Sequence, residues 1–271
     1  MKQPTPYIPQ LQLQHLAVGY GNQSVQTGLN LKAEAGTLIC LLGKNGCGKS
    51  TLLRTLAGLQ APLEGSILFA GYPDESACLD MQKLSQQQRA KLLALVLTER
   101  LSMDNTTVHD VVAMGRYPYS SFLGGLTDAD ENVISEALQQ TGLEDKAAQF
   151  FNCLSDGEKQ RVLIAKALAQ QTPLILLDEP TAHLDLNNRI RTLLLLKQLA
   201  HTARKCVIIS THELDLALQT ADTVWLMTPG QGVETGTPEE LTASGAFQTA
   251  FQDDNFSFVA ENGQLRIRLK P

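Results

Sequence analysis

Short apolar runs alternate with segments of helical periodicity along much of the chain. The best candidates for buried strands are four runs rich in leucine, isoleucine and valine: Leu38–Leu42, Leu174–Leu177, Val207–Ser210 and Thr223–Met227. Strands that alternate with helices are typical of an α/β protein. The pattern therefore predicts an α/β fold with a mixed sheet, a mainly parallel core and flanking helices.

The pattern changes between residues 85 and 160. Helical segments follow one another there with no convincing strand between them: Ser85–Leu95, Val108–Met114 and Asp128–Thr141. Such a run within an alternating chain is typical of an insertion. We therefore expect a helical subdomain over 85–160, inserted within a main domain that spans 10–235.

The end of the chain alternates polar and apolar residues with a period of two. Two such stretches, Phe256–Phe258 and Leu265–Leu269, flank Asn262-Gly263. An Asn-Gly pair between alternating segments is a strong short-range signal for a hairpin. We therefore expect 236–271 to be a short C-terminal extension that carries a β-hairpin.

Composition excludes several classes of function. The net charge of −6 gives no electrostatic footprint for nucleic acid. The five cysteines form no C-x-x-C pair, which argues against a zinc site or a disulfide framework. No apolar stretch approaches the roughly 18 residues of a membrane-spanning helix, and the N-terminus has no secretory pattern. We expect a cytoplasmic protein that reaches a membrane only through a partner.

A phosphate-binding loop is indicated where Leu38–Leu42 leads into GKNGCGKST and then into a helical pattern. The match to G-x-x-x-x-G-K-[S/T] has the strand, loop and helix setting that the motif requires. Glycines let backbone N–H groups approach phosphate oxygens at a helix start. Lys49 would contact the β- and γ-phosphates, and Ser50 would be a magnesium ligand. The candidate nucleotide-binding residues of the loop are Gly43, Asn45, Gly46, Cys47, Gly48, Lys49, Ser50 and Thr51.

Two alternatives remain open at this loop. A glycine-rich turn that happens to precede a helix would give part of the same pattern. Cys47 is either a small residue that fits the loop or a thiol whose oxidation would block nucleotide entry.

Two adjacent carboxylates, Asp178 and Glu179, end the strand Leu174–Leu177. Neighbouring residues of a strand point in opposite directions, so the two acids can do different jobs. Asp178 is suited to orient a magnesium ion. Glu179 is suited to accept the proton of the water that attacks the γ-phosphate, or to position that water. A solvated acidic turn is the alternative, and the phosphate loop makes it the weaker one.

The segment LSDGE, Leu154–Glu158, opens a further helix, because Ser155 and Glu158 match the capping-box pattern. A helix start with a serine and a glycine is also an anion site, so the residues alone leave both interpretations open. His212 follows the strand Val207–Ser210 and is a candidate γ-phosphate contact, with a surface or capping histidine as the alternative.

Taken in order, these motifs resemble the ATP-binding cassette (ABC) family from about Leu11 to Met227. The order is Tyr20, GKNGCGKST, LSDGE, LILLDEP, the turn Ala182–Asp185 and His212. The resemblance implies a P-loop NTPase fold of the ABC type, with ATP and Mg²⁺ as cofactors. It also implies ATP hydrolysis, with Lys49, Glu179 and His212 as catalytic residues.

The family resemblance implies a dimer as the catalytic unit, in which two cassettes close head to tail over two ATP molecules. Tyr20 would stack on adenine. Ser155 and Gly157 would touch the γ-phosphate bound to the opposite subunit, and Asp185 would lie at the contact between subunits.

Within the family, three stretches look like importers for iron–siderophore complexes, haem and cobalamin: Thr106–Pro118, Leu163–Gln170 and Pro180–Leu186. The pair Gly115-Arg116 is the most suggestive part. The implied partners are a second ATP-binding subunit in a homodimer, integral membrane permease subunits and, indirectly, a periplasmic or surface substrate-binding protein. The implied location is the cytoplasmic face of the inner (plasma) membrane, attached through the permease.

Two departures from the family pattern stand out. The usual signature reads LSGGQ, whereas here Asp156 replaces a glycine and Glu158 replaces the glutamine; Lys159 and Arg161 are candidates to offset this charge. The family also carries a glutamine beside the magnesium, before the helical insertion.

That glutamine is missing from the stretch Leu95–Arg100. Thr98 aligns best with its position, and Glu99 offers another acceptor on the metal side. The candidate metal ligands are therefore Ser50, Asp178 and Thr98.

Two other functions compete with the importer interpretation. A soluble ABC ATPase of translation or DNA repair would carry two cassettes in one chain or a long coiled-coil insertion. A nucleotide-gated binding module without hydrolysis is supported only by the altered signature, and intact Lys49, Asp178, Glu179 and His212 argue against it.

Overall fold

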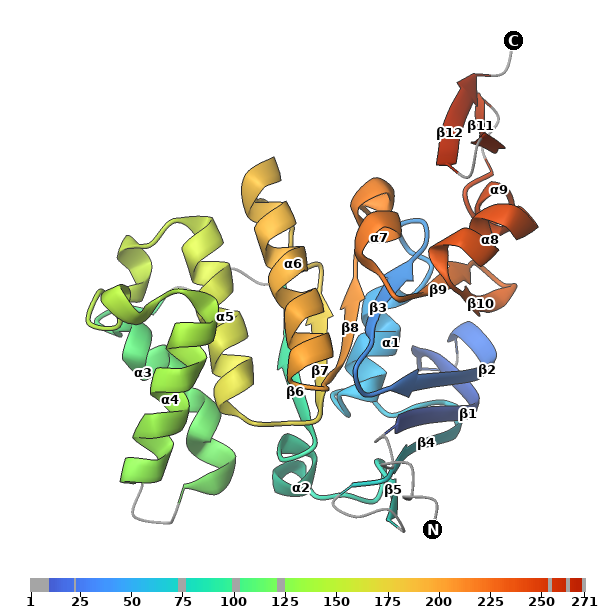
Figure 1. Cartoon of the computed structure of the whole chain (residues 1–271). Helices are drawn as coiled ribbons and strands as arrows, with labels where there is room; N and C mark the ends of the chain where they lie inside the picture. The colour runs from blue at the N-terminus through green and yellow to red at the C-terminus, as the bar shows by residue number, and fades with distance from the viewer. Residues whose placement is uncertain are drawn as a thin grey trace, which may run out of the picture.

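A six-stranded sheet, a smaller antiparallel sheet and a group of helices make up most of the molecule (Figure 1). The computed structural model describes residues 10–21, 23–72, 77–98, 103–120, 125–252, 255–261 and 264–269. The helices α3 (Val108–Ala113), α4 (Asp128–Thr141) and α5 (Asp156–Ala169) gather on one side of the molecule, and the antiparallel strands β1 (Gln10–Tyr20), β2 (Gln23–Glu34) and β4 (Glu64–Ala70) lie on the other. The six-stranded sheet runs between these two regions.

The six-stranded sheet confirms the predicted α/β fold. Its neighbouring strands, in order, are β10 (Gly232–Gly236), β9 (Thr223–Thr228), β3 (Leu38–Leu42), β8 (Cys206–Ser210), β7 (Leu174–Asp178) and β6 (Leu93–Val96). Five of them pair in parallel, and β10 pairs antiparallel with β9. The four predicted strands are β3, β7, β8 and β9, which are long apolar runs because helices or strands cover both faces.

Alternate residues of β3 enter different cores. Leu38 and Cys40 pack in a cluster with helices α3 to α7, whereas Ile39 and Leu41 pack with α1 and the smaller sheet. The helices against the faces of the sheet include α1 (Lys49–Leu56), α6 (Leu186–Thr202) and α7 (Leu214–Thr220). The sheet therefore lies between two apolar layers that cover its faces. Polar residues of the site can lie only at the ends of its strands.

The smaller sheet is antiparallel and was not predicted. Its strands, in order, are β2 (Gln23–Glu34), β1 (Gln10–Tyr20), β4 (Glu64–Ala70) and β5 (Cys78–Asp80). Leu11 and Leu13 are buried and alternate with glutamines, which is the period-two pattern of a strand with one covered face.

The prediction that no strand interrupts 85–160 is wrong. The predicted helix at Ser85–Leu95 is only α2 (Gln86–Ala90), and β6 follows it as the edge strand of the main sheet. Leu93 pairs in parallel with Leu174, and Val96 with Leu177. A short apolar run does not distinguish strand from helix by periodicity, so pairing with β7 decides its structure.

The helical group begins after β6 and its helices start at capping boxes. Its described elements are α3 (Val108–Ala113), η1 (Met114–Tyr119), α4 (Asp128–Thr141), η2 (Glu144–Lys146), η3 (Phe151–Cys153) and α5 (Asp156–Ala169). Thr107, Thr127 and Ser155 cap α3, α4 and α5, each with an acidic residue that returns the bond. Helices were predicted over Val108–Met114 and Asp128–Thr141, and both predictions are confirmed.

The C-terminal part contains α8 (Pro238–Ser244), α9 (Ala246–Ala250) and the antiparallel pair β11 (Phe256–Glu261) and β12 (Gln264–Leu269). The predicted pair of strands is therefore confirmed; Asn262 and Gly263 lie outside the described residues. Figure 1 shows the pair beyond α9. Among the helices that the structure describes, none is long and apolar enough to span a bilayer.

Candidate functional site

The phosphate loop connects the end of β3 to α1 and requires glycine at its tightest points. A Cβ at Gly43 would lie 2.5 Å from the carbonyl oxygen of Met227, and Gly43 has φ of +153°. A Cβ at Gly48 would lie 2.7 Å from Val25 Cγ1, with φ of +109°. L-residues with side chains are disfavoured at such angles, so both glycines are needed to form the loop.

Lys49 points back into the loop that precedes it. Its Nζ donates to the carbonyl oxygens of Gly43 at 2.8 Å and Lys44 at 3.2 Å, and the residue is only 6% exposed. The loop thus curls around one buried ammonium group. A positive charge held in this way is suited to contact phosphate oxygens.

Cys47 is enclosed on the inner side of the loop. It is buried, and burial raises the pKa of its thiol. Gln26 holds the loop there: its Nε2 donates to the carbonyl oxygens of Cys47 at 3.2 Å and Thr228 at 2.9 Å. A buried, protonated thiol favours the interpretation of Cys47 as a small residue that fits the loop.

Asp178 lies where several strand ends meet. The Ser50 hydroxyl donates to Asp178 Oδ1 at 3.1 Å, and the Ser210 hydroxyl donates to the same oxygen at 2.5 Å. The Thr98 hydroxyl donates to the Asp178 backbone carbonyl at 2.7 Å. Because β3, β6, β7 and β8 are parallel, their carboxyl ends share one edge, and this edge is the usual ligand position of such sheets.

The oxygen donors at this edge fit a magnesium ion. Mg²⁺ prefers carboxylate and hydroxyl oxygens, and it usually takes only one or two carboxylates from the protein together with phosphate oxygens and water. Asp178 and Ser50 supply one of each kind. Thr98 lies beside them, whereas Glu99 lies outside the described residues.

Glu179 has a strained backbone. Its φ is +46°, which is uncommon for a residue with a side chain, and strain of this kind is concentrated at functional sites. Its N–H lies 2.9 Å from Ser210 Oγ and 3.2 Å from the Ser210 carbonyl oxygen. His212 Nδ1 lies 3.5 Å from Glu179 Oε1. The structure thus brings the predicted carboxylate and histidine together, with both side chains reaching solvent.

Tyr20 ends β1 beside the phosphate loop. The residue is 54% exposed, and the Thr51 hydroxyl donates to its phenolic oxygen at 3.1 Å. It borders a cleft of about 660 Å³ that Arg54 and Leu59 also line. An exposed ring fixed next to the loop suits the predicted stacking on a base, which stays a prediction.

The signature segment is a well-capped helix start. The Ser155 hydroxyl donates to Glu158 Oε2 at 2.7 Å, and the Ser155 N–H donates to the same oxygen at 2.9 Å. The Glu158 carboxylate also pairs with Lys146. The Lys146 ammonium, followed by Ser155, lowers the pKa of Glu158 to about 2.

The charge of Glu158 is therefore offset by Lys146 and not by the predicted Lys159 and Arg161. Arg161 Nη1 donates to the Thr141 carbonyl oxygen at 3.4 Å, and Lys159 Nζ lies 6.0 Å from the centroid of the Phe151 ring. Lys146 ends η2, 12 residues before Glu158 in the sequence, and only the fold brings the two side chains together.

Gly157 packs against the start of α6. A Cβ on Gly157 would lie 2.8 Å from Asn188 Cγ. Asn188 in turn donates through Nδ2 to Asp185 Oδ2 at 2.8 Å, and its N–H donates to Asp185 Oδ1 at 2.9 Å. The structure thereby joins the signature glycine to the predicted subunit-contact residue Asp185.

Three residues at the site were missed from the sequence: Ser210, Gln26 and Asn188. Ser210 carried a signal, because it ends a predicted strand two positions before His212, where side chains reach the ligand edge. Gln26 and Asn188 carried none, since each acts through a contact with a distant segment.

Comparisons with known proteins show relatives over most of the chain. The family model for ABC transporters matches residues 26–182. The achromobactin transport ATP-binding protein of Dickeya dadantii is 36% identical over 239 residues, which cover 88% of this chain and 86% of that protein. The cobalamin import ATP-binding protein of Halobacterium salinarum is 39% identical over 216 residues, which cover 80% of this chain and 52% of that protein.

A solved structure extends the likeness to the fold of nearly the whole chain. It is described as a metal-chelate type ABC transporter in an inward-facing conformation, with a TM-score of 0.77, 27% identity and coverage of 97% of each chain. The chain belongs to the ABC transporter family, as an ATP-binding subunit of the ATPase type.

Proposed function

We propose that this chain hydrolyses ATP to drive import of an iron–siderophore, haem or cobalamin-type substrate through a separate membrane permease. The observation that carries the ATPase part is the constellation of Lys49, Ser50, Asp178, Glu179 and His212 at one edge of the sheet. The named transport roles of the similar proteins support the importer and the cargo class.

Each residue has a role that follows from its position. The loop glycines and Lys49 hold the phosphates, while Ser50, Asp178 and Thr98 surround the place for Mg²⁺. Glu179 accepts the proton of the attacking water or positions that water, and His212 contacts the γ-phosphate. Magnesium, when bound, neutralises charge on the phosphate oxygens.

The active unit in this proposal is a homodimer. Ser155 and Gly157 lie at the start of α5, whose first N–H groups suit an anion, and they would face the ATP held by the partner copy. The permease would anchor the dimer at the cytoplasmic face of the plasma membrane. A substrate-binding protein would deliver cargo from the other side.

The test is to purify the chain from detergent-solubilised membranes with its co-purifying proteins. Magnesium-dependent ATPase is then recorded with and without a binding protein loaded with an Fe³⁺–siderophore, and Lys49→Ala serves as the inactive control. Stimulation in the presence of a polytopic partner is the expected result. A partnerless ATPase that ignores the loaded protein would overturn the importer and favour a soluble ABC ATPase.

A further inference from the structure

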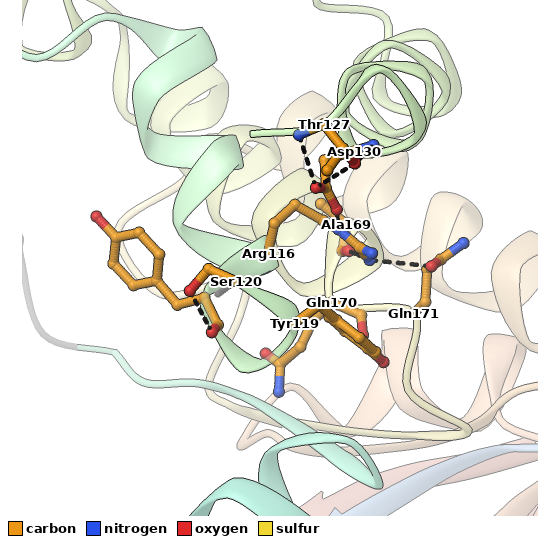
Figure 2. Close-up of polar contacts among 9 residues, drawn as sticks. Arg116, Tyr119, Ser120, Thr127, Asp130, Ala169, Gln170 and Gln171 are labelled. Carbon is orange, nitrogen blue, oxygen red and sulfur yellow. Dashed lines mark hydrogen bonds and ion pairs between the residues drawn. The ribbon is translucent and has the colours of Figure 1, made fainter. Parts of the chain in front are cut away.

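Arg116 is a buried arginine that joins three segments of the helical group. It lies in η1 and is 7% exposed. Its Nε donates to Asp130 Oδ1 at 2.7 Å, and its Nη1 donates to the Ala169 carbonyl oxygen at 2.8 Å and to Gln171 Oε1 at 2.9 Å (Figure 2). One guanidinium group thus contacts α4, the last residue of α5 and the turn that leads to β7.

Acceptors at the start of α4 and at the end of α5 stabilise the positive charge of the guanidinium. Asp130 belongs to the capping box of α4, where it accepts from the Thr127 N–H at 3.0 Å and the Thr127 hydroxyl at 2.7 Å. Ala169 ends α5, where carbonyl oxygens lack partners within the helix and attract a cation. The fork of the guanidinium can serve both ends at once, which the single ammonium of lysine cannot do with the same geometry.

The contacts continue from Arg116 to the edge strand. The Tyr119 ring lies under the guanidinium, with 4.2 Å between Arg116 Cζ and the ring centroid. The Tyr119 hydroxyl donates to the Gln170 carbonyl oxygen at 3.0 Å. Gln170 Nε2 donates to the carbonyl oxygens of Ala90 at 2.6 Å and Leu93 at 2.8 Å, and Leu93 is the first residue of β6.

These contacts lie at the junction between α5 and β7, and both of these elements lead to the site. Helix α5 carries Ser155 and Gly157 at its start, and β7, which follows its end, leads to Asp178 and Glu179. Helix α5 has 14 residues, so it is about 20 Å long, and a tilt of about 6° at its end moves its start by about 2 Å. Displacements of this size are large for a group that must contact a phosphate.

We propose that Arg116 is a positioning residue that sets the orientation of α5 relative to β6 and β7, and so places Ser155 and Gly157 for the closed dimer. The inference rests on the proposed dimer. Arg116 contacts the end of α5 that is farther from the signature, so ATP binding to a single chain does not need it, whereas dimer closure and hydrolysis do.

The test compares Arg116→Lys and Arg116→Met with the control Glu131→Gln in the complete transporter. Glu131 follows Asp130 on α4, but its side chain is 49% exposed and pairs with His109 at 2.8 Å on the surface. We expect Arg116→Lys to lower kcat by at least about tenfold, with ATP affinity of the isolated chain within about twofold of wild type. Glu131→Gln should match wild type in both.

A second experiment measures dimer closure in a chain that does not hydrolyse ATP. In the Glu179→Gln background, ATP-dependent dimers are measured by size-exclusion chromatography. Added Arg116→Lys should reduce the dimer, and added Glu131→Gln should not. If Arg116→Met fails to fold, Arg116→Lys still decides.

Two results would overturn the inference: kcat and dimerisation of Arg116→Lys equal to those of the control, or an equal loss of single-chain ATP affinity, which indicates general structural damage. A wild-type chain without ATPase activity would instead refute the proposed function, and with it this inference.

Discussion

The phosphate loop and the signature segment differ in how their polar groups are used. In the loop, Ser50 contacts Asp178, which belongs to a strand distant in sequence, and other strand ends add further donors. In the signature segment, Ser155 contacts Glu158 of its own helix. One region is therefore a site assembled by the sheet, and the other is a helix start whose polar groups are satisfied within the same helix.

The same two regions differ in how they treat charge. The loop buries a single cation, Lys49, against carbonyl oxygens, and this charge is available to an incoming phosphate. The signature segment carries Glu158, whose carboxylate is already paired with Lys146. An acidic residue at this position is thus compatible with an anion nearby, because a cation of the same chain offsets its charge.

The largest effect is expected for Glu179→Gln, which distinguishes the hydrolysis step from ATP binding at the assembled site. Glu179→Gln removes the proton acceptor while keeping the size of the side chain, so kcat should fall by about a thousandfold. ATP affinity should stay near wild type, and a nucleotide-bound dimer should accumulate. Single-turnover kinetics and size-exclusion chromatography measure both. Turnover at the wild-type rate would show that Glu179 is not the base.

A second variant tests the local packing of the signature segment. Gly157→Ala places a Cβ 2.8 Å from Asn188 Cγ, so the Asn188 side chain must shift and lose its hydrogen bond to Asp185; we expect a loss of about 1 kcal/mol in the free energy of unfolding. The double variant with Asn188→Ala should recover most of this loss relative to Asn188→Ala alone. Urea unfolding measures all four proteins. Additive losses would mean that the two residues do not interact.

Ser210→Ala tests whether the sheet orients the acids. The variant removes a hydrogen bond to the Asp178 carboxylate and one from the Glu179 N–H. Hydrogen bonds to charged groups contribute about 1.5 kcal/mol or more, so kcat should fall by about tenfold. Thr211→Ser, which keeps a hydroxyl at the residue directly after β8, is the control for a general effect at the end of this strand. Unchanged kcat in Ser210→Ala would contradict this orienting role.

The smallest effect concerns pH. Hydrogen bonds from Lys146 and then from Ser155 lower the pKa of Glu158 from 4.5 to about 2, so the ionised form favours the folded state. This stability is present above pH 4.5 and is lost as the pH falls toward about 2. Glu158→Gln should cost about 1 kcal/mol at pH 7, and this cost should disappear as the pH falls through about 2. Thermal unfolding at several pH values measures this; a difference from wild type that does not change with pH would exclude the ion pair as its cause.

The core strands and the phosphate loop could be predicted because their signals are local. Residues 38–42 are apolar throughout, and the glycine and lysine spacing that follows matches the phosphate-loop motif in full. The capped starts of α4 and α5 were equally local, since Thr127 and Ser155 meet acids three residues later. The strand β6 was not predicted because its signal is not local: its four residues become a strand only through pairing with β7.

By itself, the sequence determined the α/β class, the phosphate loop, the acidic strand end and the family, because each depends on residues that are neighbours along the chain. Only the tertiary structure decided that Ser210 contacts Asp178, that Lys146 pairs with Glu158 and that Arg116 joins α4 to the end of α5. The physical reason is that a buried charge is stable only with a partner at hydrogen-bonding distance and in suitable geometry. Which residue becomes that partner depends on how elements distant in sequence pack together.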